Sequence, residues 1–227
     1  MTEPPDPESS TRTSAEPLPS PGRAFALYSA LRLLLLLVSF VVLRLLLGPD
    51  NPLLVVGGAV LEIGFGTGLN LPHYPEHVRR ITTVDPNPGM NRIARRRIAE
   101  GGITVDQRVL SGEALPFKDG SFDCVVSTWT LCSIPDAGRA VDEVYRVLRP
   151  GGRFLYLEHG ISDDPAVRRW QRRLNPLQRL LGDGCRLDLD VPALVGSRPF
   201  ADLVVERFEM ERVPRTHGTM YRGRAVK

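Results

Sequence analysis

The strongest structural signal in this chain is the run Val60-Leu-Glu-Ile-Gly-Phe-Gly-Thr-Gly-Leu-Asn70. Apolar residues lead into a loop with glycine at positions 64, 66 and 68. This pattern predicts a buried strand, a tight turn and then a helix, as at the start of an α/β sheet. Glycine has no Cβ, so the backbone of such a loop can approach a ligand closely. We therefore expect a nucleotide-like cofactor at this turn.

The spacing of the glycines and two acidic residues narrow the choice of cofactor. A dinucleotide fingerprint, G-x-G-x-x-G, requires glycine at position 69, where this chain has Leu69. Glu62 places a carboxylate at the strand end, which suits a cationic ligand. Asp85 closes a second predicted strand 21 positions after Gly64, where an acid can accept both hydroxyls of a ribose. The pattern therefore favours a cationic nucleoside over a pyrophosphate cofactor.

These residues resemble the class I S-adenosylmethionine-dependent methyltransferases, and two later segments extend the resemblance. The segment 111–127 is similar to that family's adenine-binding loop and fourth strand, and 147–158 is similar to its Arg-Pro-Gly-Gly turn and fifth strand. The resemblance implies S-adenosylmethionine as the cofactor. The cofactor-binding residues that it implies are Glu62, Gly64, Gly66, Gly68, Asp85, Asn87, Met90, Glu113, Ala114, Ser127 and Thr130. Phe65 stands where the family commonly has a small or polar residue.

A closer resemblance is to the membrane-anchored alkyl thiol S-methyltransferases and their bacterial relatives, and it runs from about Val60 to the last residue. The segments that carry it are Thr130-Leu-Cys-Ser-Ile134, Glu158-His159, Gly182-Asp-Gly-Cys-Arg186 and Tyr221-Arg-Gly-Arg-Ala-Val-Lys227. It implies methyl transfer to a small lipophilic acceptor, with a thiol as the best guess. A quinone ring and a phospholipid headgroup are the alternatives, and a scaffold that binds S-adenosylmethionine without turnover is an alternative of another class.

The alternation of apolar segments predicts a Rossmann-like α/β fold. It has a seven-stranded, mostly parallel sheet, an antiparallel last strand and helices on both faces. The predicted strands are 59–63, 80–85, 104–110, 122–127, 153–158, 203–210 and 220–226, and the predicted helices are 69–78, 88–100 and 137–148.

His159 is our candidate general base, because it follows the fifth predicted strand at the sheet edge where α/β proteins bind ligands. A structural role for His159 is the competing interpretation, and His217 is a weaker candidate base. Trp129 fits either the acceptor site or a packed core. Methyl transfer needs no enzyme nucleophile, so we interpret Cys132 as a buried small residue.

Composition excludes several classes of partner. A net charge of +3 on 227 residues is too small for a nucleic-acid binder, and no obligate protein partner is evident. Three cysteines without C-x-x-C spacing predict neither a disulfide framework nor a zinc site. The pentapeptide His73-Tyr-Pro-Glu-His77 matches a metalloprotease pattern, but Pro75 would disrupt the helix that the pattern needs. We therefore predict no metal site.

The N-terminal quarter differs in composition from the rest of the chain. Residues 1–22 contain six prolines and four serines and are predicted to be a disordered tail. Residues 23–48 are almost wholly apolar and long enough to cross a bilayer, so we expect a membrane-anchor helix. The methyltransferase domain would then occupy residues 51–227. We expect the protein to be membrane-associated, with this catalytic domain in the cytoplasm.

The segment 163–181 carries five arginines and no acid after Asp164, with Trp170, Leu174, Leu177 and Leu181 at helical spacing. Pro176 predicts two short helices hinged at Asn175. The apolar stripe faces either the core or, with the arginines, an anionic lipid surface.

Overall fold

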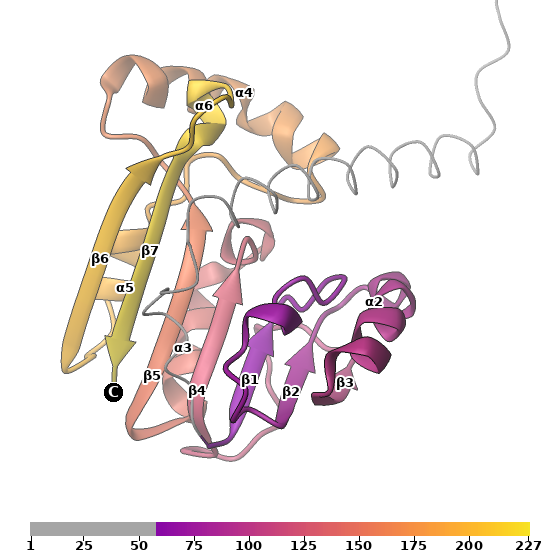
Figure 1. Cartoon of the computed structure of the whole chain (residues 1–227). Helices are drawn as coiled ribbons and strands as arrows, with labels where there is room; N and C mark the ends of the chain where they lie inside the picture. Colours follow the sequence, from indigo (N-terminus) through magenta and orange to yellow (C-terminus); the bar gives the residue numbers. More distant parts are fainter. Residues whose placement is uncertain (1–57) are drawn as a thin grey trace, which may run out of the picture. The chain divides into compact units, whose positions relative to one another are not determined.

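The computed structural model describes residues 58–227, which form one α/β domain around a seven-stranded sheet (Figure 1). The predicted tail at 1–22 and the predicted anchor at 23–48 lie outside the described residues. Within 58–227, no helix is long and apolar enough to cross a membrane.

Each strand of the sheet lies close to its predicted position. The strands are β1 (Val60–Ile63), β2 (Arg80–Val84), β3 (Thr104–Arg108), β4 (Phe122–Thr128), β5 (Leu148–His159), β6 (Asp202–Glu209) and β7 (Thr219–Val226). Their order is β3-β2-β1-β4-β5-β7-β6, and β7 is antiparallel to both of its neighbours. The predicted mostly parallel sheet with an antiparallel last strand is therefore confirmed.

The helices differ more from the prediction than the strands do. The helical elements are η2 (Leu71–His73), α2 (Pro88–Gly101), η3 (Leu131–Ser133), α3 (Ala137–Val147), α4 (Pro165–Leu181), α5 (Val191–Gly196) and α6 (Arg215–Gly218). The predicted helix at 69–78 is wrong: only the short η2 forms there, because Pro72 and Pro75 remove backbone donors and clash with a preceding turn. The predicted hinge at Asn175 is also wrong, because α4 continues through Pro176.

Hydrogen bonds at the turn after α4 account for its continuity. The side chain of Asn175 donates to Asp188 at 2.8 Å and accepts from the Leu187 backbone at 2.9 Å. These bonds hold the helix at the residue before the proline, where steric clash would otherwise favour extended backbone. The tertiary contact therefore outweighs the local preference.

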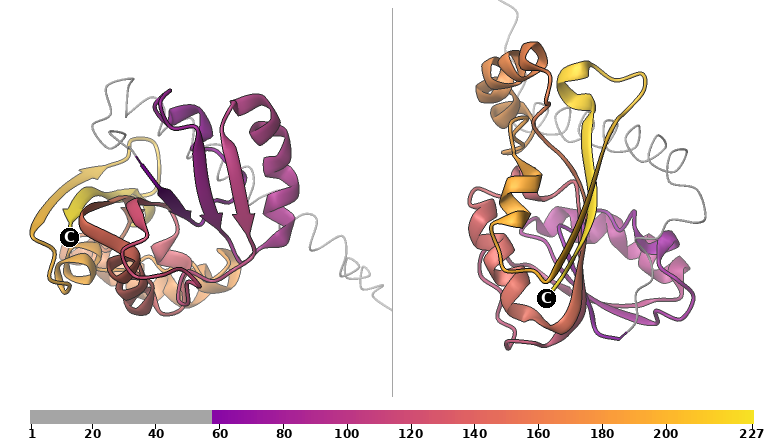
Figure 2. Two further views of the ribbon diagram at one scale, coloured as in Figure 1. Left: turned by 90° about the horizontal axis from the view of Figure 1, so that it is seen from below. Right: turned by 90° about the vertical axis from the view of Figure 1, so that its left-hand side faces the viewer.

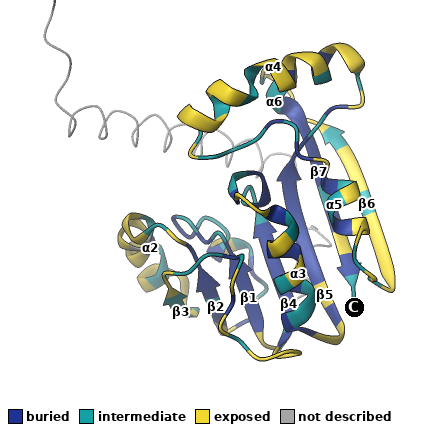
Figure 3. Cartoon of the chain, turned by 180° about the vertical axis from the view of Figure 1, so that it is seen from behind, coloured by how far each residue is buried: buried dark blue, intermediate teal, exposed yellow. Residues whose placement is uncertain are grey.

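Apolar side chains on both faces of the sheet are buried against helices. One cluster joins Leu61 and Val125 to the apolar side of α3, and the other joins Val60 and Ile81 to Ala94 of α2. Figure 2 shows helices on opposite sides of the twisted sheet, and Figure 3 shows the buried central strands behind α3 and α5. Helices on both faces, as predicted, are therefore present in the described domain.

Two caps fix where the helices nearest the site begin. The side chain of Asn87 accepts from the Gly89 backbone at 2.9 Å, and Pro88 occupies the first turn. The helix α2 therefore begins at Pro88, three residues after the second predicted acid, Asp85. Asp136 accepts from Arg139 at 2.9 Å and caps α3 in the same way.

Replacing Leu61 by alanine tests the central packing. Leu61 is 0% exposed, so Leu61→Ala should lower the free energy of unfolding by about 2–5 kcal/mol. Leu180, 76% exposed on α4, is the matched control, and its alanine variant should change stability by less than about 0.5 kcal/mol. Urea unfolding measures both, and equal losses in the two variants would contradict the assigned core.

Candidate active site

The glycine loop after β1 turns sharply where β1 meets its neighbours. Gly64 has a φ of +72° and its backbone N–H donates to the Val84 carbonyl at 2.8 Å. A Cβ built on Gly64 would overlap the side chain of Thr130, so the loop and the turn after β4 are in direct contact. At Gly66, with φ +56°, the nearest atom to an added Cβ is the Gly64 carbonyl oxygen at 3.9 Å. The loop is therefore packed on one side and open at its middle glycine.

Asp85 lies beside this loop and fits a ribose. One carboxylate oxygen accepts from the Gly66 backbone and the other from the Asn87 backbone, both at 2.8 Å. A carboxylate has about four acceptor positions, so two remain for hydroxyl groups. Asn87 and Met90 follow on the first turn of α2 and are partly exposed. The structure thus brings together Gly66, Asp85 and Asn87 from the predicted set.

Glu62 is buried at the end of β1, with 1% of its surface exposed. Its two carboxylate oxygens accept from Asn70 at 2.8 Å and from the Tyr74 hydroxyl at 2.7 Å. Asn70 also donates to Thr128 at 2.8 Å and so links the ends of β1 and β4. Burial raises the pKa of Glu62 to about 7, against the opposing effect of the hydrogen bonds from Tyr74 and Asn70. A cation placed beside this acid would favour its ionised form.

Asn70 and Tyr74 are site residues that the sequence analysis missed. Both were assigned to a helix, and the two prolines that prevent this helix were the available signal. In the turns and the short 3-10 helix that form instead, their polar groups point back to Glu62.

Glu113 holds the loop that follows β3, which the sequence predicts to be the adenine-binding loop. Its carboxylate accepts from the Ser111 hydroxyl at 2.8 Å and from the Asp136 backbone at 2.8 Å, which ties the loop to the start of α3. Ala114 is exposed next to it.

A buried carboxylate that was not among the predicted cofactor ligands, Glu158, organises the turn after β4. It accepts from Ser127 Oγ at 2.6 Å and from the backbone of Thr130 and Leu131 at 2.9 and 3.1 Å. Ser127 was predicted to touch the cofactor, but it is fully buried and its hydroxyl donates a hydrogen bond to Glu158. The Glu158 bonds fix Thr130, the residue that meets Gly64.

His159 does not face open solvent. Its ring is 3% exposed, stacks on Trp129 with centroids 5.6 Å apart, and places Nε2 at 3.6 Å from the Cys185 sulfur. The Cys185 sulfur lies 3.6 Å from that of Cys132. Burial lowers the pKa of His159, but the hydrogen bond and charge of Cys185 outweigh it and raise this pKa overall. The weaker candidate, His217, contacts Thr216 and Gln178 instead.

Trp129 belongs to the same region and has unusual backbone geometry. Its φ is +53°, which is strained for a residue with a bulky side chain. Its indole N–H is buried and lacks a hydrogen-bond partner within 58–227. The ring packs against a small cluster with Leu157, Met210 and Met220, so the packed interpretation of Trp129 accounts for its ring.

Comparisons with known proteins find similarity to methyltransferases. A methyltransferase domain family matches residues 61–156. The chain is 40% identical over 144 residues to the thiol S-methyltransferase TMT1A of Homo sapiens, covering 62% of this chain and 57% of that protein. It is 34% identical over 128 residues to a phosphatidylethanolamine N-methyltransferase of Cereibacter sphaeroides, and this match covers 56% of this chain and 63% of that protein. It is 33% identical over 116 residues to the ubiquinone/menaquinone C-methyltransferase UbiE of Hydrogenovibrio crunogenus, and this match covers 49% of this chain and 46% of that protein.

Solved structures show the same fold. A methyltransferase from Thermotoga maritima, titled a possible histamine N-methyltransferase, superposes with a TM-score of 0.57 at 24% identity. That match covers 83% of this chain and 92% of the other.

The fold and the glycine loop with its paired acids are those expected of a class I S-adenosylmethionine-dependent methyltransferase domain, and residues 61–156 match a methyltransferase domain family. Within that class the chain is related to the thiol S-methyltransferases. The chain spans less than two thirds of the length of those relatives. The cofactor fits the described residues, because Gly66 is open, Asp85 has free acceptor positions and Glu62 offers an acid for a cation.

Replacing Gly64 tests the contact between the loop and the turn after β4. Gly64→Ala would place a Cβ inside Thr130 at a positive φ, so we expect affinity for S-adenosylmethionine to fall about tenfold or more. Gly102 is the control, because it also has a positive φ but has nothing within 4 Å of an added Cβ. Calorimetric titration measures both, and tight binding by Gly64→Ala would contradict the close contact.

The pKa of Glu62 predicts a pH effect on stability. Because folding raises this pKa from 4.5 to about 7, the folded state binds more protons than the unfolded state between these values. The contribution of Glu62 to the free energy of unfolding is therefore fully present below about pH 4.5 and is lost as the pH rises to about 7. Relative to wild type, Glu62→Gln should gain about 3 kcal/mol of stability between pH 4.5 and 7.5. Urea unfolding at both pH values measures the difference, and a difference that does not change with pH would contradict the assignment.

Proposed function

We propose that the protein transfers the methyl group of S-adenosylmethionine to a small lipophilic thiol. One observation carries the proposal. The three segments around residues 132, 159 and 185, by which the chain resembles thiol S-methyltransferases, converge so that the ligand-type atoms of Cys132, His159 and Cys185 lie within 4.8 Å of one another. Cys132 of this cluster lies two residues after Thr130, which contacts the cofactor loop at Gly64.

The residues of the chain divide the work of methyl transfer. S-adenosylmethionine supplies an electrophilic methyl group on a sulfonium. Asp85 would hold the ribose and the glycine loop would support the donor, while Glu62 would lie near its positive charge. The turn fixed by Glu158 would position the acceptor in line with the donor, which is the main requirement of a displacement reaction. The buried Cys132 and His159 and the partly buried Trp129 would exclude water from that side.

The runner-up acceptors are an aminophospholipid and a quinone ring, and both have relatives with those activities. Enzymes of the three kinds share the cofactor residues, so the acceptor side carries the distinction. The thiol is favoured because the cysteine and histidine cluster gathers the segments that resemble the thiol enzymes.

The assay that tests this proposal uses the full chain, labelled S-adenosylmethionine and three acceptor classes: alkyl thiols, aminophospholipids and quinone precursors. We expect methylated thiol. Asp85→Asn should raise KM for S-adenosylmethionine about 10–100-fold with a smaller effect on kcat, because it weakens donor binding. Asp106→Asn is the control, because the carboxylate of Asp106 contacts Arg108 of the same strand, β3. A quinone or lipid product without a thiol product would refute the choice of acceptor.

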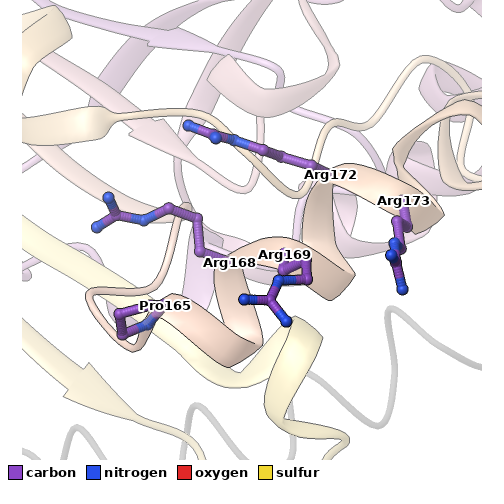
Figure 4. Close-up of a pocket in the computed structure, with 5 residues that line it drawn as sticks. All are labelled: Pro165, Arg168, Arg169, Arg172 and Arg173. Carbon is purple, nitrogen blue, oxygen red and sulfur yellow. The ribbon is translucent and has the colours of Figure 1, made fainter.

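We also propose that α4 contacts an anionic membrane surface. Its arginines Arg169, Arg172 and Arg173 are exposed and take part in no ion pair within 58–227, and Trp170, Leu177 and Leu181 are each more than half exposed. Together with Pro165 and Arg168, these arginines line a shallow pocket in which the guanidinium groups spread apart (Figure 4). Exposed leucines beside unpaired arginines suit a lipid interface better than a core. Gln171 on the opposite side is fully buried and bonds Ser162 and Gly160, which anchors the helix.

Vesicle sedimentation tests this surface. The full chain should pellet more with vesicles containing phosphatidylserine than with neutral vesicles, and changing Arg169, Arg172 and Arg173 to glutamine should remove most of the difference. The matched control changes the exposed Arg92, Arg95 and Arg96 of α2 to glutamine. If both triple variants lose the preference equally, α4 has no special role.

A further inference from the structure

Cys132, His159 and Cys185 form a cluster with the composition of a metal site. They come from η3, from the end of β5 and from the loop after α4, so no local spacing in the sequence marks them as a set. Sequence analysis therefore predicted no zinc site. Two cysteines and one histidine are typical zinc ligands, and three protein ligands with a fourth position open characterise catalytic zinc sites.

Two of the three distances within the cluster match those around a tetrahedral zinc ion. Zn–S bonds of about 2.3 Å and Zn–N bonds of about 2.0–2.1 Å give a sulfur–sulfur edge of about 3.8 Å and a sulfur–nitrogen edge of about 3.6 Å. The observed separations are 3.6 Å between the sulfurs of Cys132 and Cys185 and 3.6 Å between the Cys185 sulfur and His159 Nε2. All the ligand-type atoms lie within 4.8 Å of one another. Both sulfurs and the ring can therefore point at one ion.

The surrounding structure holds the three residues in this arrangement. The Arg186 backbone donates to the Cys132 carbonyl at 2.9 Å, which joins the loop of Cys185 to η3. Gly184 has a φ of +82°, and an added Cβ would lie 3.1 Å from the Ser133 carbonyl oxygen, so the two loops are closely packed. Glu158 fixes the start of η3 through Leu131. The ligands are thus preorganised by backbone contacts.

His159 faces the cysteines through Nε2, which lies 3.6 Å from the Cys185 sulfur. His159 Nδ1 is buried and has no hydrogen-bond partner within 58–227. A thiolate and an imidazole in a largely buried site are the groups that bind zinc.

We propose that Cys132, His159 and Cys185 bind one zinc ion, and that its fourth position takes the thiolate of the methyl acceptor. The second part rests on the proposed thiol methyltransferase function. On binding, the acceptor thiol loses its proton to solvent. Its sulfur then forms a bond to the methyl carbon as the bond from that carbon to the sulfonium sulfur breaks, which leaves S-adenosylhomocysteine as the other product.

Metal content tests the first part without any activity measurement. The full chain, expressed with added zinc and purified without chelators or an affinity-tag metal, should carry about one zinc ion per chain by plasma mass spectrometry. Cys132→Ser, His159→Asn and Cys185→Ser should each lose most of the zinc. Cys124→Ser is the matched control, because Cys124 is buried in the core cluster of Val60 and Ile81, away from the proposed ligands. The Cys124→Ser variant should therefore retain the zinc ion. Calorimetric binding of S-adenosylmethionine identifies which variants are folded.

A folded wild-type chain without zinc, or with a Cys132–Cys185 disulfide in its place, would overturn the metal site. So would full zinc content in all three cluster variants.

Cobalt substitution tests the second part. Cobalt in a tetrahedral site with two sulfur ligands gives intense visible bands and a sulfur-to-metal charge-transfer band. Adding an alkyl thiol should shift these bands, and a matching alcohol should not. Unshifted bands in a chain that methylates thiols would refute acceptor binding at the metal while leaving the proposed function intact. Failure of thiol methylation in a chain that carries zinc would refute the proposed function and leave the metal site standing.

Discussion

The site depends on one buried carboxylate, that of Glu158. It binds the Ser127 hydroxyl and two successive backbone N–H groups after β4, and it is 0% exposed. A buried acid with several hydrogen bonds is costly to leave unpaired, so the turn that satisfies it is held firmly. That turn presents Thr130 to the glycine loop on one side and carries Cys132 on the other. Donor side and acceptor side are therefore fixed relative to each other by a residue expected to touch neither ligand.

A second acid, Glu62, performs a comparable task on the donor side. It is satisfied by Asn70 and Tyr74, and Asn70 also reaches Thr128 at the end of β4. The two buried acids thus join β1, β4 and β5 at their carboxyl ends, the edge at which open α/β sheets bind ligands. Asp85 is also buried, with 8% of its surface exposed, and it retains acceptor capacity for a ribose.

The central strands β1, β2 and β4 were predictable from the sequence because they are largely buried apolar runs, and Gly64 follows β1 while Asp85 follows β2. Local rules failed where tertiary contacts or proline chemistry decided the outcome. Pro72 and Pro75 prevented the first helix, whereas Pro176 did not break α4, because Asn175 is held by Leu187 and Asp188. The donor acids were recognisable from their spacing after β1 and β2. The cluster of Cys132, His159 and Cys185 was not, because only the folded chain brings those three segments together.

The central claim is that the edge formed by the β1 loop and Asp85 holds S-adenosylmethionine. A crystal structure of the full chain with S-adenosylhomocysteine tests it most directly. We predict both ribose hydroxyls within hydrogen-bond distance of the Asp85 carboxylate, with the ligand's sulfur on the side of Thr130. A ligand bound elsewhere, or bound without contact to Asp85, would contradict the account.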